Sequence, residues 1–363
     1  HDLNFLIETL NNLKTLKGPK FLHIITTKGK GYLPAEEDPI GYHAISKMPS
    51  PNEKIINTKT KYSDIFGEWA CNTAQEDKNL IAITPAMTEG SGLVNFSQTF
   101  PNQFYDVAIA EQHSMTFAAG LACAGKKPVL AIYSTFLQRA YDQLIHDVAI
   151  QNLDVLMAID RAGFVGEDGA THAGIFDLTF LRCIPNLTVM TPANEDELWK
   201  MLNTGYLLKG PVAVRYPRGS GPGEKIENTN ATIEIGKARI IKETENDIAL
   251  LSFGSLLDLA SEISNELNSS LIDMRFVKPL DESLILSLAQ KHKLLVTLEE
   301  NVVAGGAGSA VNEILNKNLL TCEILNIGIP DHFPSIGTPS DQKIEAGLDK
   351  ERILKIIDKK LNS

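Results

Sequence analysis

The sequence is poor in cysteine and has no long apolar run. Its four cysteines, in 363 residues, are far apart and form no CxxC pair, so neither a zinc site nor a disulfide framework is indicated. Widely spaced single cysteines fit reduced thiols in a cytosol. No apolar run approaches the length of a membrane helix, and the first residues lack the basic start and cleavage site of a signal peptide. We therefore expect a cytoplasmic protein.

Basic residues are also scarce. Lysine and arginine total 34 against 45 aspartate and glutamate residues, which leaves a net charge of −11. This balance argues against a general nucleic-acid or anionic-membrane surface, although it permits a local basic pocket. A hydrophobic content of 43% with 22% charged residues is ordinary for a globular protein, and the length suits two or three domains.

Residues 1–60 do not have the pattern of a domain of their own. They contain one predicted helix over 3–16, one predicted strand over 21–25 and a glycine-broken loop over 28–32, followed by a polar, proline-containing stretch. One helix and one strand cannot bury a core. The chain also begins without Met. We therefore expect a fragment or processed product whose first segment is the end of a domain plus a linker.

From Tyr62 onward, apolar strands alternate with helical stretches, which predicts parallel sheets covered by helices on both faces. We predict two consecutive α/β domains, over 61–222 and 241–363, joined by a linker over 223–240. The predicted strands are 80–83, 105–109, 129–133, 155–160, 187–191 and 212–215 in the first domain, and 248–253, 271–274, 294–298 and 322–327 in the second.

Glu111 is the most informative single residue. It closes the run 105–111, which we interpret as a short buried strand ending in a carboxylate, and it precedes an apolar helix predicted over 115–124. The carboxyl ends of parallel strands are where open α/β sheets bind ligands, and burial there would raise the pKa of the carboxyl into the range useful for proton transfer. The alternative is that Glu111 only begins a helix, where acidic residues are favoured.

The loop after the strand 155–160 carries several polar groups. Arg161, Asp168 and His172 lie in a stretch with four glycines among fourteen residues, which would let the backbone approach a ligand closely. Asp168 and His172 are near enough in sequence to pair, and such a pair would fix the tautomer of the imidazole. A lone loop histidine is usually structural or solvated, but this combination indicates a functional site.

Two further loops of the first domain carry aromatic or cationic residues. Phe136 and Arg139 follow the strand 129–133, although core packing and a solvated helix position would explain them equally well. Arg218 precedes a glycine-rich turn after the strand 212–215, which suits a phosphate but would also fit a plain turn. In the second domain, the glycines at 305–308 lack the pattern of a phosphate loop, and close packing of a helix on a strand explains them better.

Several runs of the sequence resemble the 1-deoxy-D-xylulose-5-phosphate synthase family, in the transketolase-like group of thiamine diphosphate enzymes. The resemblance extends over essentially the whole chain. The early FLHIITTKGKGY and GYHAI look like the end of the family's first domain and its linker. The other runs are DVAIAEQH, AIYSTFLQRAYDQ, DRAGFVGEDGATHAG, AVRYPRG, DMRFVKPLD and EENVVAGGAGSAVNE.

The resemblance implies a homodimeric transferase that decarboxylates pyruvate on thiamine diphosphate and joins the two-carbon unit to D-glyceraldehyde 3-phosphate. The product, 1-deoxy-D-xylulose 5-phosphate, enters isoprenoid, thiamine and pyridoxal phosphate synthesis. The cofactor carries the hard chemistry, and the protein orients and protonates it. Glu111 would hydrogen-bond a ring nitrogen of the cofactor's aminopyrimidine and promote the tautomer that deprotonates the thiazolium.

The resemblance also implies roles for other residues. Phe136 would stack on the aminopyrimidine, and Tyr32 would contact the cofactor. His43 would handle pyruvate, while His172, held by Asp168, would shuttle protons. The residues that would bind the substrate phosphate or hold charge beside it are Tyr133, Arg139, Arg161 and Arg218, and arginines in three loops suit a phosphorylated acceptor.

The sequence departs from the family in one large respect. Family members bind the cofactor diphosphate through Mg²⁺ with a Gly-Asp-Gly motif and a later asparagine, and no Gly-Asp-Gly occurs in this chain. We therefore expect the metal ligands to lie in an N-terminal part that this chain lacks. We also expect the chain alone to bind thiamine diphosphate poorly and to be inactive.

Two rival interpretations remain open. A β subunit of a 2-oxo acid dehydrogenase would have the same two-domain plan and a comparable glutamate, but it would begin near Tyr62, and the Arg218 loop disfavours it. A non-catalytic regulatory or assembly protein would have had little reason to keep Glu111, Asp168, His172 and Arg218 together.

Overall fold

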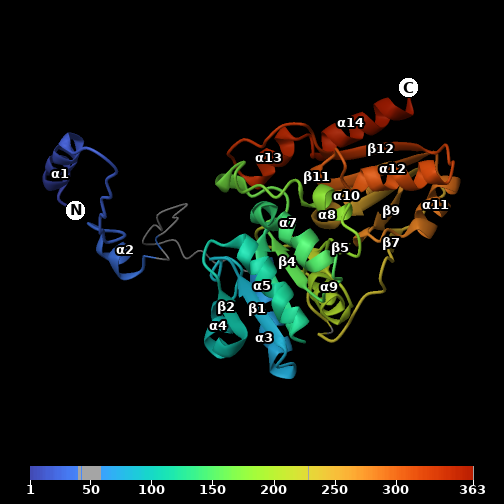
Figure 1. The fold of residues 1–363 in the computed structure, drawn as a ribbon. Coiled ribbons are helices and arrows are strands. Elements are labelled where there is room, and N and C mark those ends of the chain that lie inside the picture. The colour runs from blue at the N-terminus through green and yellow to red at the C-terminus, as the bar shows by residue number, and fades with distance from the viewer. Residues whose placement is uncertain (40–41, 43–58, 228, 363) are drawn as a thin grey trace. The chain divides into compact units, whose positions relative to one another are not determined.

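The structure, a computed structural model, describes residues 1–39, 42, 59–227 and 229–362. The chain forms two compact units, residues 1–57 and 58–363. Their elements are labelled in Figure 1. None of the helices within the described ranges is long and apolar enough to cross a membrane.

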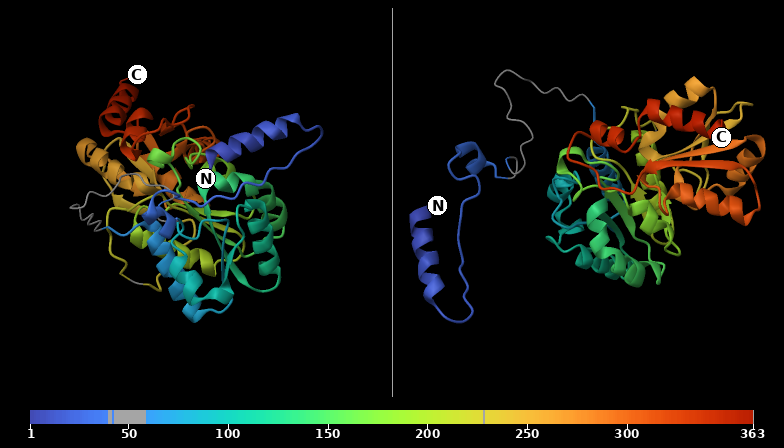
Figure 2. Two further views of the ribbon diagram at one scale, coloured as in Figure 1. Left: turned by 90° about the vertical axis from the view of Figure 1, so that its left-hand side faces the viewer. Right: turned by 90° about the horizontal axis from the view of Figure 1, so that it is seen from above.

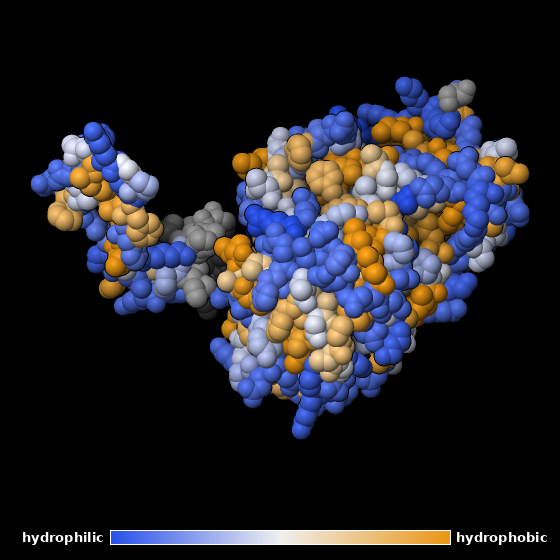
Figure 3. Space-filling model, in the orientation of Figure 1, coloured by the Kyte–Doolittle hydropathy of each residue, from blue (hydrophilic) through white to orange (hydrophobic). Residues whose placement is uncertain are grey.

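The first unit contains two helices, α1 (Leu3–Thr15) and α2 (Leu33–Glu37). Asp2 caps α1 by accepting the N–H of Phe5 at 3.0 Å. The strand predicted over 21–25 is wrong, because no strand forms there and Phe21 is 90% exposed. A strand needs a neighbour to bond its main-chain groups, and this unit offers none among its described residues. Ala35 is the one buried residue described in it, so apolar side chains lie at its surface (Figure 3).

The second unit begins with a seven-stranded sheet. Its strand order is β10-β5-β6-β4-β3-β1-β2, and every neighbouring pair is parallel except β10 with β5. The strands are β1 (Leu80–Thr84), β2 (Phe104–Asp106), β3 (Lys127–Tyr133), β4 (Leu156–Asp160), β5 (Thr188–Met190), β6 (Val212–Arg215) and β10 (Phe276–Lys278).

Helices cover both faces of this sheet. Leu80 and Ala82 of β1 pack into one buried cluster, while the intervening Ile81 and Ile83 pack into another, as expected for a parallel strand buried on both sides. The first cluster includes α3 (Tyr62–Glu76), α4 (Val94–Thr99) and α9 (Glu195–Leu207). The second includes α5 (Glu111–Cys123), the helical run of α6 (Ser134–Leu137), η2 (Gln138–Ala140), α7 (Tyr141–Gln143) and η3 (Leu144–Ala149), and α8 (Asp177–Arg182).

A five-stranded sheet follows, in the order β12-β11-β8-β9-β7, with β7 antiparallel to β9 and the other pairs parallel. Its strands are β7 (Arg239–Lys242), β8 (Ile248–Phe253), β9 (Ser270–Asp273), β11 (Leu294–Val302) and β12 (Glu323–Ile329). Its helices are α10 (Leu257–Leu267), α11 (Glu282–Lys291), α12 (Ala307–Lys317), α13 (Pro339–Glu345) and α14 (Lys350–Leu361). Short turns are η1 (Pro101–Gln103), η4 (Gly166–Asp168) and η5 (Gly254–Leu256).

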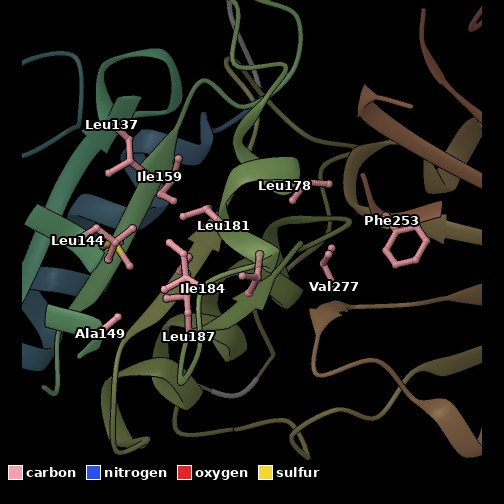
Figure 4. Packing of buried hydrophobic residues seen from close by; sticks show 14 of the residues in the cluster. Leu137, Leu144, Ala149, Ile159, Leu178, Leu181, Ile184, Leu187, Phe253 and Val277 are labelled. Carbon is pink, nitrogen blue, oxygen red and sulfur yellow. The ribbon is translucent and has the colours of Figure 1, made fainter. Parts of the chain in front are cut away.

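We call residues 59–222 the first half of this unit and residues 229–362 the second half. The two halves lie side by side in both further views (Figure 2), and one buried cluster contains residues of both sheets. Buried side chains continue from Leu144 through Leu181 to Val277 and Phe253 of the second half (Figure 4). Strand β10 adds to the connection, because it belongs to the second half in sequence, between β9 and α11, but pairs with β5 of the first sheet. The predicted class, two consecutive parallel-sheet α/β regions, is confirmed, with antiparallel β7 and β10 as unpredicted additions.

The interpretation of 105–111 as a buried strand is wrong. Strand β2 ends at Asp106, lies at the edge of the sheet and is largely exposed. The Asp106 carboxylate accepts the N–H groups of Ala86 at 3.0 Å and Ala108 at 2.9 Å, and Ala108 has a φ of +59° that turns the chain out of the sheet. Glu111 is therefore the first residue of α5, as the alternative prediction had it, although its side chain is buried.

Candidate active site

The loops that carry the predicted site residues converge because their strands are neighbours. Strands β6, β4, β3, β1 and β2 lie side by side and run in parallel, so their carboxyl ends share one edge of the sheet, where open α/β sheets bind ligands. Arg218, Arg161, Phe136 and Glu111 follow the ends of four of these strands.

Glu111 and Arg139 form an ion pair between two of these loops. Nη1 of Arg139 donates to Oε1 of Glu111 at 2.8 Å. The Glu111 side chain is 4% exposed, whereas that of Arg139 is 55% exposed. A buried carboxylate with one oxygen in a charge-assisted hydrogen bond is held in a fixed orientation. The arginine that holds it lies at the surface, where an entering ligand would meet it.

Phe136 connects this pair to the next loop. Its half-buried ring stacks on Tyr133, with centroids 5.4 Å apart. The His172 ring is steeply inclined to the Phe136 ring, at 70°, and their centroids are 5.6 Å apart. The Arg139 guanidinium lies 5.9 Å from the Phe136 centroid. Phe136 is therefore flanked by an aromatic ring, an imidazole and a cation, rather than enclosed in the apolar core.

Two arginines meet at the Asp168 carboxylate. Nη1 of Arg161 lies 2.9 Å from Oδ2 of Asp168, and Nη1 of Arg218 lies 3.5 Å from the same oxygen. The Arg161 guanidinium also stacks over the Tyr133 ring at 4.1 Å. Two guanidinium groups that converge on one anionic oxygen form the arrangement that binds carboxylate or phosphate.

Burial changes the proton affinity of two groups beside this cluster. It raises the pKa of Tyr133 to about 12, against the opposing charge of Arg161, so the phenol is a neutral donor. It also raises the pKa of Asp160 to about 7, although Arg161 again opposes the change. Oδ1 of Asp160 accepts the main-chain N–H of Arg161 at 2.6 Å. Arg161 itself has a φ of +57°, a conformation uncommon for non-glycine residues.

The predicted pairing of Asp168 with His172 is wrong. Asp168 is engaged by Arg161 and Arg218, while Nδ1 of His172 lies 2.9 Å from the Thr171 hydroxyl. Two full positive charges attract a carboxylate more strongly than an imidazole does. Both residues still contact other candidate site residues. His172 contacts the Phe136 ring, and Asp168 contacts both arginines.

Two of the loop glycines lie against the second half of the unit, and the predicted close approach of a ligand to the loop stays a prediction. A Cβ on Gly163 would overlap the Glu300 carboxylate, and a Cβ on Gly166 would lie 2.8 Å from Cδ of Pro339. Glu300 and Pro339 belong to the second half of the unit. These glycines have φ values of +80° and +74° and no Cβ, so the second half can pack closely against the loop. This packing accounts for the two glycines without a ligand.

The remaining sequence expectations have separate outcomes. Tyr32 is the N-cap of α2 in the first unit, with its ring 5.7 Å from that of Tyr42. His43 lies outside the described residues. The packing explanation of the glycines at 305–308 is confirmed, because a Cβ on Gly308 would overlap the side chains of Thr297 and Asn326.

Sequence reasoning missed three contributors. Gly90, in the loop after β1, leaves room for the Tyr133 hydroxyl, which a Cβ would overlap. The Gly90-Ser91-Gly92 run after an apolar strand was a usable signal. Asp160, the last residue of β4, could have been found in the same way. Gln342 contacts the site loop from α13, and nothing in its local sequence marks it.

The described residues offer no ready metal site, since no group of three or more histidine, cysteine, aspartate or glutamate side chains among them could hold an ion. They do suit an aminopyrimidine ring. The buried Glu111 carboxyl can share a proton with a pyrimidine ring nitrogen, and both it and the half-buried Phe136 ring contact Arg139.

Comparison with known proteins gives two family matches. Residues 58–223 match the transketolase pyrimidine binding domain, and residues 236–353 match the transketolase C-terminal domain. Among solved structures, "Split gene transketolase, inactive beta4 tetramer" is 26% identical with a TM-score of 0.73, and the match covers 83% of this chain and 98% of that one. The transketolase from Campylobacter jejuni, 20% identical with a TM-score of 0.66 over 82% of this chain and 46% of its own, supports the fold alone.

Curated relatives match the chain over nearly its whole length. They are named 1-deoxy-D-xylulose-5-phosphate synthase. The Hahella chejuensis protein is 58% identical over 100% of this chain, that of Colwellia psychrerythraea 57% over 98%, and that of Pseudomonas aeruginosa 56% over 100%. The chain spans 57% of the length of the first relative and 58% of the other two.

Proposed function

The chain belongs to the transketolase family, and we propose that it supplies the aminopyrimidine and acceptor-phosphate side of a 1-deoxy-D-xylulose-5-phosphate synthase. The proposed reaction condenses pyruvate with D-glyceraldehyde 3-phosphate, with release of CO₂, to give 1-deoxy-D-xylulose 5-phosphate. The name carried by relatives that are 56–58% identical supports this choice.

One observation carries the proposal. A continuous series of contacts joins Glu111 through Arg139, Phe136 and Tyr133 to Arg161. Arg161 and Arg218 both contact the same oxygen, Oδ2 of Asp168. In this proposal, the Glu111 carboxyl at one end of the series bonds a cofactor ring nitrogen, and the pair of arginines at the other end binds an anion. A reaction between a cofactor-bound unit and a phosphorylated aldehyde needs both.

Thiamine diphosphate, when bound, would stabilise the negative charge left on the substrate carbon as CO₂ leaves. Glu111 would hold a hydrogen bond to a ring nitrogen of the cofactor, and the flat face of Phe136 would orient that ring. Since Arg139 already engages one oxygen of Glu111, the other oxygen is the one we assign to the cofactor.

The acceptor would bind at the two arginines. Arg161 and Arg218 would take the phosphate of D-glyceraldehyde 3-phosphate in place of, or together with, the Asp168 oxygen that they now share. Nδ1 of His172 is held by Thr171, so we assign Nε2 as the nitrogen that exchanges a proton with the bound substrate. Burial raises the pKa of Tyr133 to about 12, which suits its phenol to donate a hydrogen bond to the phosphate.

We further propose that this chain alone binds thiamine diphosphate weakly and turns over little. No Gly-Asp-Gly occurs in its sequence, and no metal-binding cluster occurs in the ranges that the structure describes. A structural neighbour that the chain covers almost completely is titled an inactive β4 tetramer of a split-gene transketolase. A tight, Mg²⁺-dependent affinity of the chain for thiamine diphosphate, measured by calorimetry, would refute this part.

The assembly and location are also proposals. The same neighbour's title describes a tetramer of one kind of subunit, which supports self-association, and we propose a homodimer. Cys71, Cys123, Cys183 and Cys322 are free thiols, which suits the reducing cytoplasm.

Product analysis tests the proposed reaction. The chain would be combined with the part of the Hahella chejuensis relative that it does not match, together with Mg²⁺ and thiamine diphosphate. Incubation with pyruvate and D-glyceraldehyde 3-phosphate should yield a deoxypentulose phosphate, identified by mass. Acetaldehyde or an acetylated carrier as the main product would contradict the proposal.

A further inference from the structure

The loop that carries Arg161, Asp168 and His172 is held from the second half of the unit by a buried carboxamide. Gln342 of α13 is 1% exposed. Its Oε1 accepts the N–H of Gly166 at 2.9 Å, and its Nε2 donates to the carbonyl of Gly166 at 3.1 Å. One side chain thus bonds both main-chain groups of a single loop residue, two positions before Asp168.

A second attachment lies nearer the start of the loop. Oε1 of Glu300, on β11, accepts the N–H of Phe164 at 2.8 Å. Its Oε2 accepts the Ser255 hydroxyl at 2.9 Å, and Nζ of Lys343 lies 3.4 Å away. Glu300 is 3% exposed. A buried carboxylate with partners on both oxygens has one stable orientation, so it fixes the main chain that it bonds.

The second half provides these attachments from α13 and β11. Helix α13 begins with a capping box, in which Thr338 and Asp341 bond each other's main chain at 3.0 and 3.2 Å. Nε2 of Gln342 also donates to the carbonyl of Ser335 at 2.7 Å. The Gln342 carboxamide is therefore held within the second half by Ser335 and bonds the loop at Gly166.

We propose that Gln342 and Glu300 are positioning residues that fix the 161–172 loop, so that Arg161 and Asp168 meet Arg218 at the spacing a phosphate needs. Both attachment points, Phe164 and Gly166, lie between Arg161 and Asp168 in sequence. A shift of the loop would therefore move Arg161 and Asp168 relative to the end of β6, from which Arg218 extends to bond the Val165 carbonyl of the same loop. That the anion is the phosphate of the acceptor rests on the proposed function.

The inference can be tested with paired methionine variants of the 363-residue chain. Gln342→Met removes the carboxamide with little change in volume. Gln103→Met is the matched control, because Nε2 of Gln103 also donates to a main-chain carbonyl, that of Leu80 at 2.8 Å, at the opposite end of β1. The reporters are amides that Gln342 does not bond, namely Gly174, which donates to the carbonyl of Gly163 at 2.9 Å, and His172, which donates to that of Gly169 at 3.1 Å.

We expect hydrogen exchange at these two reporter amides to be roughly ten times faster in Gln342→Met than in the wild type, because local opening exposes the loop. The Kd for D-glyceraldehyde 3-phosphate, measured by calorimetry, should rise about tenfold, since a small misplacement of binding groups has a large effect. Gln103→Met should change neither quantity. Unchanged exchange in Gln342→Met, or faster exchange with unchanged affinity, would overturn the inference.

A conservative pair at position 300 separates positioning from charge. Glu300→Gln retains an oxygen to accept the N–H of Phe164, so exchange and affinity should stay close to wild-type values. Glu300→Met loses that bond and should resemble Gln342→Met. Equal damage from both substitutions would overturn the assignment for Glu300.

The failure of the proposed function has a different signature. A wild-type chain that binds neither D-glyceraldehyde 3-phosphate nor inorganic phosphate would contradict the assigned acceptor site. The reporter amides would still decide whether the two residues hold the loop: faster exchange in Gln342→Met supports the attachment, and unchanged exchange overturns it.

Discussion

Nη1 of Arg139 donates to Oε1 of Glu111 across 2.8 Å and so joins α5 to the turn that follows β3. The exposed Arg139 side chain thereby fixes the orientation of the buried Glu111 carboxylate. It also leaves the other Glu111 oxygen for the bond to a cofactor ring nitrogen that we propose. The Phe136 ring, 5.9 Å from the Arg139 guanidinium, links this pair to Tyr133.

Replacing Glu111 should abolish catalysis without abolishing acceptor binding. Glu111→Gln keeps an oxygen for Arg139 but cannot exchange a proton with the cofactor ring nitrogen, so CO₂ release from pyruvate should fall by about 10² or more, the typical contribution of a positioned acid or base. The assay uses the chain combined with the unmatched part of the Hahella chejuensis relative. The affinity of the variant for D-glyceraldehyde 3-phosphate should match that of the wild type. Activity close to wild type would contradict the assigned role.

Removing an acceptor arginine should affect one substrate selectively. We expect Arg218→Met to raise the KM for D-glyceraldehyde 3-phosphate by roughly ten- to a hundredfold, because a charge-assisted contact to phosphate is lost. The KM for pyruvate should change little. Arg352→Met, at an exposed position of α14, is the control. Equal effects on both substrates would indicate a general disturbance rather than a phosphate contact.

The raised pKa of Asp160 predicts a specific dependence of stability on pH. Burial raises this pKa from 3.8 to about 7, so the folded state holds the proton more strongly than the unfolded state. Stability should therefore fall as the pH rises from about 4 to about 7 and then level off, by an amount up to the order of 4 kcal/mol. Asp160→Asn should lack this decrease. Urea unfolding at several pH values measures it, and parallel curves for the two proteins would contradict the assignment.

The buried pair between Arg215 and Asp177 should be important for stability. Nε of Arg215 lies 2.8 Å from Oδ2 of Asp177, and Nη2 donates to the carbonyl of Glu300 at 2.6 Å. Arg215→Met should destabilise the chain by about 3–5 kcal/mol, because Asp177 would stay buried without its partner. Urea unfolding should show a smaller loss for the double variant Arg215→Met with Asp177→Leu. A double variant as unstable as the single one would contradict this explanation.

Much of the fold was predictable because parallel strands buried on both faces are apolar throughout. The runs at 129–133 and 248–253 stand out for this reason, and loops that follow neighbouring strands must converge. Strands β7 and β10 escaped prediction because each is short and its partner is distant in sequence. Strand β10 pairs with β5 through Phe276 and Met190, which are 86 positions apart in the sequence.

The gathering of the candidate residues at one edge of the sheet was predictable, but their contacts with one another were not. Glu111, Phe136, Arg161 and Arg218 follow strand ends, a position that sequence reveals. The partner of Asp168 depends on where Arg218 lies, fifty residues later, so nearness to His172 in sequence was misleading. The contact of Gln342 with the loop was hidden for the same reason, since 176 positions separate it from Gly166.

Release of CO₂ from pyruvate, followed with and without D-glyceraldehyde 3-phosphate, tests the central claim most directly. The chain would be combined with the unmatched part of the Hahella chejuensis relative, Mg²⁺ and thiamine diphosphate. We predict that release rises sharply when the aldehyde is added and that a deoxypentulose phosphate accumulates in step with it. Release that is indifferent to the aldehyde but is coupled to lipoyl transfer would contradict the synthase assignment and favour a 2-oxo acid dehydrogenase.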